Sequence, residues 1–216
     1  MRLTILGSTG LVGKVLLAKA LEAGHQVKTL VRNPAKLGEY RERVEQVVGD
    51  ATDSAAVESA IAGSEAILST IAPPQRNPGD PRRYEQAMKH VLCALEANGR
   101  RRIVHIGGAG YAVVEGEQWT LRRRLLRGGL LLFAKPILEA KWLEWQALKA
   151  SSLDWTLLRP PAILARAPAG RLFADERRLP NISVNLFDFA DFMLEQATSL
   201  DWIRKCPLVS SGGGCL

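Results

Sequence analysis

The sequence predicts an α/β fold in which helices cover both faces of a parallel sheet. Apolar strands and helical segments alternate five times in the first half of the chain, and this alternation requires crossover connections. The strands are continuously apolar, as expected for strands that are buried on both faces. A glycine-rich turn, Gly7-x-x-Gly10-x-x-Gly13, follows the first strand and opens the first helix.

This turn predicts a nucleotide site, because backbone amides and a helix N-terminus can together bind a pyrophosphate. Gly7 would make the turn tight, Gly10 would let the backbone approach the phosphates, and Gly13 would let the helix pack closely on the sheet. A purely structural turn is the alternative. Strand, turn and helix together predict a Rossmann fold, a doubly wound parallel sheet with strand order 3-2-1-4-5-6 and its ligand at the carboxyl ends.

Glycine, proline and helix-capping residues divide the chain into elements. The predicted strands are 3–6, 26–31, 44–48, 66–71, 103–106 and 155–158, with a short seventh strand at 207–209. The predicted helices are 11–23, 53–61, 81–98, 136–150 and 189–198, the last capped by Asp188. Residues 165–183 are expected to form a loop. The length favours a single NAD(P)-binding domain, residues 1–216, which contains a loop-rich substrate region at 160–209.

The amino-acid composition and the distribution of charge limit the classes of protein to which the chain can belong. The 216 residues are 47% hydrophobic, but no apolar run is long enough to span a membrane. No signal-peptide pattern is present, so a cytoplasmic location is expected. Cys93, Cys206 and Cys215 are scattered, which predicts neither a disulfide framework nor a metal site. The net charge of +7 resides largely in arginine clusters at 100–102, 122–127 and 177–178. These clusters are expected to face solvent, and the few aromatic residues do not favour nucleic-acid binding.

Arg32 indicates which dinucleotide the fold would bind. It ends the second strand, where folds that select NAD usually carry an acidic residue, and a cation there suits the 2′-phosphate of NADP(H). Lys36 and Thr9 could support the same phosphate. We therefore expect NADP(H) to be preferred over NAD(H), with a solvated arginine as the alternative. Asp50 follows the third strand and would either contact the adenine edge or cap the following turn.

The chain resembles atypical or extended short-chain dehydrogenases/reductases, including NmrA-like proteins and biliverdin reductase B (flavin reductase). The matching segments are 7–13, 31–37, 49–50, Lys141 with Glu144, 153–160 and 188–192. The resemblance implies a Ser after the fifth strand and a Tyr-x-x-x-Lys on the next helix, where the Tyr donates a proton and the Lys lowers its pKa and holds the ribose. Here Ile106 and Gly107 stand where the Ser would be, and Ile137 precedes Lys141 by four residues, so this pair is absent.

Lys141 is the one catalytic candidate that remains. By the resemblance it would bind the ribose hydroxyls, and by its spacing it could instead be a surface lysine that pairs with Glu144. His105 is expected to be a core histidine with a partner rather than an acid, and no metal site is predicted. The predicted cofactor-binding residues are Gly7, Ser8, Thr9, Gly10, Leu11, Val12, Gly13, Arg32, Lys36, Asp50, Ala51, Ser69, Thr70, Ile71, Ile106, Gly107, Lys141, Pro160, Pro161 and Ala162.

These observations predict an NADPH-dependent reductase that transfers hydride to a small acceptor such as a flavin, a quinone or a conjugated carbonyl. The alternatives are a non-catalytic NADP(H)-binding redox-sensing regulator that acts on a protein partner, and a nucleotide-sugar epimerase/dehydratase-like enzyme. Residues 121–134 are expected to form a lid or packing segment, because Gly128-Gly129 should break the helix that a membrane surface requires. We expect neither a membrane nor a nucleic-acid partner, and a monomer or a homodimer.

Overall fold

A six-stranded parallel sheet forms the centre of the protein. The computed structural model describes residues 1–74, 77–111, 113–168 and 170–212, which leaves Cys215 and the end of the chain outside the described residues. The strand order is β3-β2-β1-β4-β5-β6, as predicted. The strands are β1 (Arg2–Leu6), β2 (Gln26–Val31), β3 (Glu45–Val48), β4 (Ala66–Ser69), β5 (Arg102–Ile106) and β6 (Asp154–Leu158).

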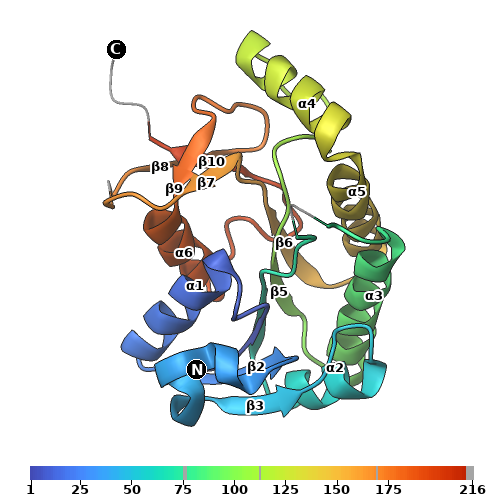
Figure 1. Cartoon of the computed structure of the whole chain (residues 1–216), viewed down its shortest axis with the longest axis vertical. Coiled ribbons are helices and arrows are strands. Elements are labelled where there is room, and N and C mark those ends of the chain that lie inside the picture. The colour runs from blue at the N-terminus through green and yellow to red at the C-terminus, as the bar shows by residue number, and fades with distance from the viewer. Residues whose placement is uncertain (75–76, 112, 169, 213–216) are drawn as a thin grey trace.

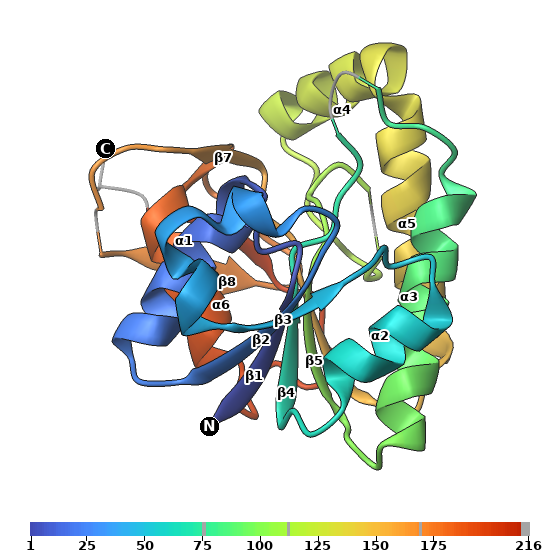
Figure 2. The same cartoon turned by 60° about the horizontal axis from the view of Figure 1, so that its bottom comes forward.

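Helices cover both faces of this sheet (Figures 1 and 2). One face carries α1 (Leu11–Glu22) and α6 (Leu186–Glu195), and the other carries α2 (Ser54–Ile61), α3 (Arg82–Ala97) and α5 (Lys135–Ala150). Alternate strand residues enter the two resulting cores, so that Leu3 and Ile5 pack with the first pair of helices and Leu6 with the second group. This double burial explains why the central strands are largely apolar.

The glycine turn has the backbone that the sequence predicts. Gly7 has a φ of 83°, in the left-handed region that favours glycine. Gly13 lies against the turn so closely that a Cβ there would be 2.1 Å from the Gly7 carbonyl oxygen. The amide of Gly10 donates to the same oxygen at 2.9 Å. The first helix can therefore leave the sheet at this angle only because residue 13 has no side chain.

Side-chain caps define the starts of α2 and α6. The Asp53 side chain accepts from the Ala55 and Ala56 amides at the start of α2, as predicted. The prediction that Asp188 caps the last helix is wrong, because Asn185 caps it and α6 begins at Leu186. Between β2 and β3 the chain forms two short 3₁₀ segments, together labelled η1 (Pro34–Arg43), which meet at a kink at Gly38, where φ is 59°.

The last third of the chain has more structure than predicted. The expected loop at 165–183 contains a strand, β8 (Leu172–Asp175). The predicted seventh strand corresponds to β10 (Leu208–Ser211), which pairs antiparallel with β8 and joins the β6 edge of the six-stranded sheet only through an isolated parallel bridge from Leu208 to Arg159. A second small sheet joins β7 (Ala162–Leu164) and β9 (Ser183–Asn185) in parallel. These pairings join segments that are distant in sequence, which local patterns do not specify.

Helix α4 (Leu121–Phe133) runs without interruption through Gly128 and Gly129, so the predicted break is wrong. The surrounding leucines and arginines favour a helix, and Thr120 accepts a hydrogen bond from the Arg123 amide at its start. The helix packs against α5 and projects from the body of the protein (Figure 1). Over the described part of the chain, no helix combines the length and the apolar character needed to cross a membrane.

The contact between α1 and the glycine turn predicts a large difference between two similar substitutions. Gly13→Ala should lower the free energy of unfolding by about 1–3 kcal/mol, because its methyl group has no space. Gly128→Ala is the matched control: this glycine is also helical, no atom lies within 4 Å of its added Cβ, and stability should rise by up to about 1 kcal/mol. Urea denaturation measures both, and equal effects would contradict the crowding at Gly13.

Candidate functional site

The carboxyl edge of the sheet brings the glycine turn next to the end of β4. The Thr70 hydroxyl lies 3.1 Å from each of two carbonyl oxygens, those of Leu6 and Gly7, and can donate a hydrogen bond to either. Ser8 is buried and its hydroxyl lies 2.5 Å from that of Thr29, so toward a ligand Ser8 can offer only its backbone amide. Gly10 and Leu11 at the start of α1 are exposed. Contacts with Thr70 and Thr29 therefore hold the turn on the side of the sheet, while Gly10 and Leu11 are open to solvent.

The charges predicted to select the cofactor lie at the ends of β2 and β3. The Arg32 side chain is 79% exposed, and its Nη1 lies 3.9 Å from Asp50 Oδ2. Asp50 also accepts from the Thr52 amide and hydroxyl, so it does cap the turn that follows β3. Burial would raise the pKa of Asp50, but the Thr52 hydrogen bonds and the Arg32 charge outweigh it and hold that pKa below its usual value. Lys36, which is close to Arg32 in sequence, is exposed on η1.

Lys141 is buried rather than on the surface, which corrects one of its two predicted roles. Its ammonium group lies 2.9 Å from each of three acceptors, the carbonyl oxygens of Ile71 and Ile106 and Oε2 of Glu144. An ammonium group has three protons, so these contacts use all of them. Lys141 therefore joins the carboxyl ends of β4 and β5, and a ribose hydroxyl could accept from it only by displacing one of the three partners.

Glu144 extends this network to two further side chains. Its Oε2 lies 3.2 Å from Nε2 of His105, whose Nδ1 lies 3.0 Å from the Ser69 hydroxyl. Burial lowers the pKa of His105, although the Glu144 carboxylate opposes this. For Glu144, burial raises the pKa, but the charges of Lys141 and His105 prevail and lower it. His105 is a buried, partnered histidine, as predicted. The role of Glu144 as its partner was not predictable, because the two residues meet only through the fold.

A side chain at Gly107, in the segment where the Ser is expected, would be tightly packed. A Cβ on Gly107 would lie 3.0 Å from both Leu157 Cδ1 and the Tyr111 hydroxyl oxygen. Tyr111 is itself buried against Trp142, with ring centroids 6.2 Å apart, and burial raises its pKa. The ionisable side chain beside Gly107 is therefore the buried phenol of Tyr111, whose neutral form is strongly favoured.

A second buried network was missed by the sequence analysis. Glu117 accepts from Arg159 Nη1 at 2.7 Å, from Arg123 Nη2 at 2.6 Å, and from the Val113 and Val114 amides. Burial would raise the pKa of Glu117, but its hydrogen bonds to Arg159 and its other donors lower it. Arg123 is 2% exposed, so the prediction that its cluster faces solvent is wrong at this position. The network ties the end of β6 to the base of α4.

The remaining predicted residues lie along the same edge. Pro160 follows Arg159, is buried, and accepts from the Ala109 amide at 3.0 Å, whereas Ala162 is exposed at the start of β7. The carbonyl oxygen of Ala51 lies 3.4 Å from Nδ1 of His90. No cluster of three or more potential metal ligands occurs among the described residues. The topology therefore gathers the predicted site at one edge without a metal centre in the described part.

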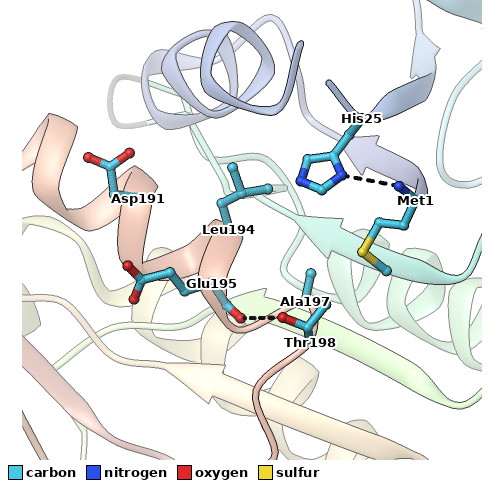
Figure 3. A pocket seen from close by; sticks show the side chains of 7 residues that line it. All are labelled: Met1, His25, Asp191, Leu194, Glu195, Ala197 and Thr198. Atoms are coloured by element: carbon cyan, nitrogen blue, oxygen red, sulfur yellow. Dashed lines mark hydrogen bonds between the residues drawn. The ribbon is translucent and has the colours of Figure 1, made fainter. Parts of the chain in front are cut away.

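A separate cavity of about 290 Å³ lies at the opposite, amino-terminal edge of the sheet (Figure 3). His25 lies 3.4 Å from the amino group of Met1 on one side, and Asp191 and Glu195 of α6 lie on the other. Asp191 is already paired with Lys19 at 2.7 Å. This cavity contains none of the predicted cofactor-binding residues.

Comparison with known proteins supports a nucleotide-binding site. A family model described as NAD(P)H-binding matches residues 7–199. A dihydroflavonol 4-reductase from Zea mays is 26% identical over 200 residues, but the match spans only 56% of its length. The Bacillus subtilis protein YwnB is 26% identical over 93% of this chain and 92% of its own. A short-chain dehydrogenase/reductase of Veillonella parvula, solved with NADP, has a TM-score of 0.80 at 17% identity and covers 98% of this chain and 95% of its own.

The buried His105 predicts how stability depends on pH. Because its folded-state pKa is lowered, the unfolded chain takes up the proton first, and stability falls as pH drops below the unfolded pKa of about 6.5. Between pH 7 and 5 the loss from this residue should be about 1–2 kcal/mol. In His105→Gln this part of the loss should disappear from denaturation curves recorded across that range. An unchanged pH slope would show that His105 does not carry it.

Proposed function

The chain belongs to the NAD(P)H-binding family, and from that premise we propose that it is an NADPH-dependent reductase acting on a small acceptor. The observation that carries this proposal is the carboxyl edge of the sheet, where an open glycine turn lies beside a site with neither the Ser nor the Tyr of the usual proton relay. Suitable acceptors are a flavin, a quinone or a conjugated carbonyl, which accept hydride with little help from an acid. The names of the maize and Veillonella relatives, a reductase and an NADP complex, agree with this class.

The cofactor preference rests on Arg32. Its guanidinium is 79% exposed and held only loosely by Asp50, so it is available to a 2′-phosphate. Arg can bind a phosphate through two parallel hydrogen bonds, whereas the ribose hydroxyls of NAD favour a carboxylate at this position. The exposed Lys36 adds positive charge to the same segment. NADP(H) is therefore the proposed partner rather than NAD(H).

The residues of the site would bind and orient rather than transfer protons. A bound nicotinamide supplies the hydride, that is, both electrons and one hydrogen nucleus. The amides of the glycine turn would hold the pyrophosphate, and Lys141 would keep the ends of β4 and β5 in place beneath the ring. His105 and Glu144 are fully buried, so the proton that completes the reduction would come from solvent.

The missing relay also favours a second candidate function. A protein that binds NADP(H) without turnover could report the redox state to a protein partner through a change in structure. The network of Glu117 would couple the site to α4, because it joins β6, the segment after β5 and that helix. This regulator would bind the cofactor but would have no acceptor.

The Arg32 assignment predicts a selective loss of affinity. Arg32→Gln should weaken NADPH binding by about tenfold or more and leave NADH binding within about twofold, because only the 2′-phosphate is lost as a partner. Calorimetric titration with both nucleotides measures this. Arg41→Gln, another exposed arginine of the neighbouring η1, is the matched control and should change neither affinity. A similar loss for both nucleotides in Arg32→Gln would contradict the assignment.

Turnover separates the two candidate functions. With NADPH, the reductase should reduce free flavin and quinones well above the rate in buffer, and should reduce a simple ketone poorly for want of an acid. The decrease in NADPH absorbance measures the rate. Tight NADPH binding with no turnover on any acceptor would favour the regulator, and efficient reduction of the simple ketone would show that a proton donor is present after all.

A further inference from the structure

Helix α4 exposes two leucines on one side. Leu121 is 73% exposed and Leu125 is 68% exposed, and the two lie one helical turn apart on the same side. Gly128 continues this side three residues later and is also exposed. Large exposed apolar residues are normal when scattered singly, but two on the same side of a helix that projects from the protein (Figure 1) indicate a contact surface. We refer to Leu121, Leu125 and Gly128 as the leucine stripe.

The opposite side of α4 is fixed to the protein, so the leucine stripe cannot turn inward. Arg123 lies between the two leucines in sequence and therefore on the far side of the helix. Its guanidinium is buried, bonded to Glu117 and to the carbonyl oxygen of Ala109, and stacked 3.9 Å from the centre of the Trp119 ring. Rotation of the helix would expose this ion pair and leave the Glu117 carboxylate with fewer partners.

The charges around the stripe are of one sign. Residues 121–133 include four arginines and no acidic residue. Glu117 neutralises Arg123, whereas Arg124 and Arg127 are exposed. A hollow of about 400 Å³ lies beside the stripe and is lined by Trp119, Arg124, Arg127, Gly128 and Leu131. Leucine and arginine on α4, with Trp119 just before the helix begins, form the composition of an interfacial membrane helix.

We propose that α4 docks the protein on an anionic phospholipid surface. The leucine stripe would enter the boundary between headgroups and acyl chains, and the flanking arginines would contact lipid phosphates. A second copy of the chain fits less well, because a two-fold pair would bring the same arginines together without carboxylates. The unbroken helix removes the reason for which the sequence disfavoured a membrane surface. This proposal does not depend on the reductase activity.

Vesicle co-sedimentation with the full chain tests the proposal. The protein should sediment with vesicles of phosphatidylcholine and phosphatidylglycerol, remain in solution with phosphatidylcholine alone, and be released by high salt. Leu125→Glu should weaken binding by about tenfold or more, and Arg124→Glu by about fivefold or more. Leu200→Glu is the matched control, because Leu200 is 75% exposed in the loop after α6, away from α4. Urea denaturation of each variant verifies that it is folded and does not rely on cofactor binding.

Several outcomes would overturn the proposal. These are the absence of sedimentation with either vesicle, equal sedimentation with neutral and anionic vesicles, or an equal effect of Leu125→Glu and Leu200→Glu. Light scattering provides a further test of the occupant. If it shows a dimer that Leu125→Glu dissociates, a second copy covers the stripe and the lipid proposal is wrong.

Discussion

The fold depends on the approach of one helix to one backbone carbonyl. With no side chain at residue 13, α1 reaches the Gly7 oxygen, and the positive φ of Gly7 turns the chain from β1 into that helix. The Thr70 hydroxyl bonds to the same carbonyl from the neighbouring strand, so the turn and the end of β4 are held as one unit. Lys141 then extends this unit to β5 through the oxygens of Ile71 and Ile106. Hydrogen bonds therefore connect the carboxyl ends of β1, β4 and β5 to one another.

Those parts of the fold that depend on local sequence were predictable. Apolar strands, glycines after helices and the capping side chain of Asp53 each act within a few residues. The alternation predicts a parallel sheet, and the glycine turn after the first strand predicts the strand order of a Rossmann fold. The last helix shows where local signals compete. Asn185 and Asp188 are both good caps, and the helix begins after the earlier one because β9 ends there. Local patterns therefore predict which helices and strands are present more accurately than the residues at which they begin and end.

The candidate site was predictable in position but not in its buried charges. The i,i+3 spacing of Lys141 and Glu144 correctly indicated a pair, yet it could not show that the pair lies beneath two strand ends. Arg123 stands among exposed arginines, and only the fold brings Glu117 to it. A buried charge needs a partner, because an isolated charge in the interior is very unfavourable. The partners of Arg159 and His105 come from distant segments, so neighbouring residues in the sequence do not reveal them.

The absence of the Ser and Tyr is a property of the packing and not only of two side chains. The space beside Gly107 is filled by Leu157 and Tyr111, and Arg159 lies 5.4 Å from the Tyr111 ring while bonded to Glu117. A Ser at residue 107 would therefore require the Leu157 and Tyr111 side chains to shift slightly, and Tyr111 packs against Arg159 of the Glu117 network. A site built in this way is suited to acceptors whose reduction needs orientation more than acid catalysis, which is the class that the proposed reductase would use.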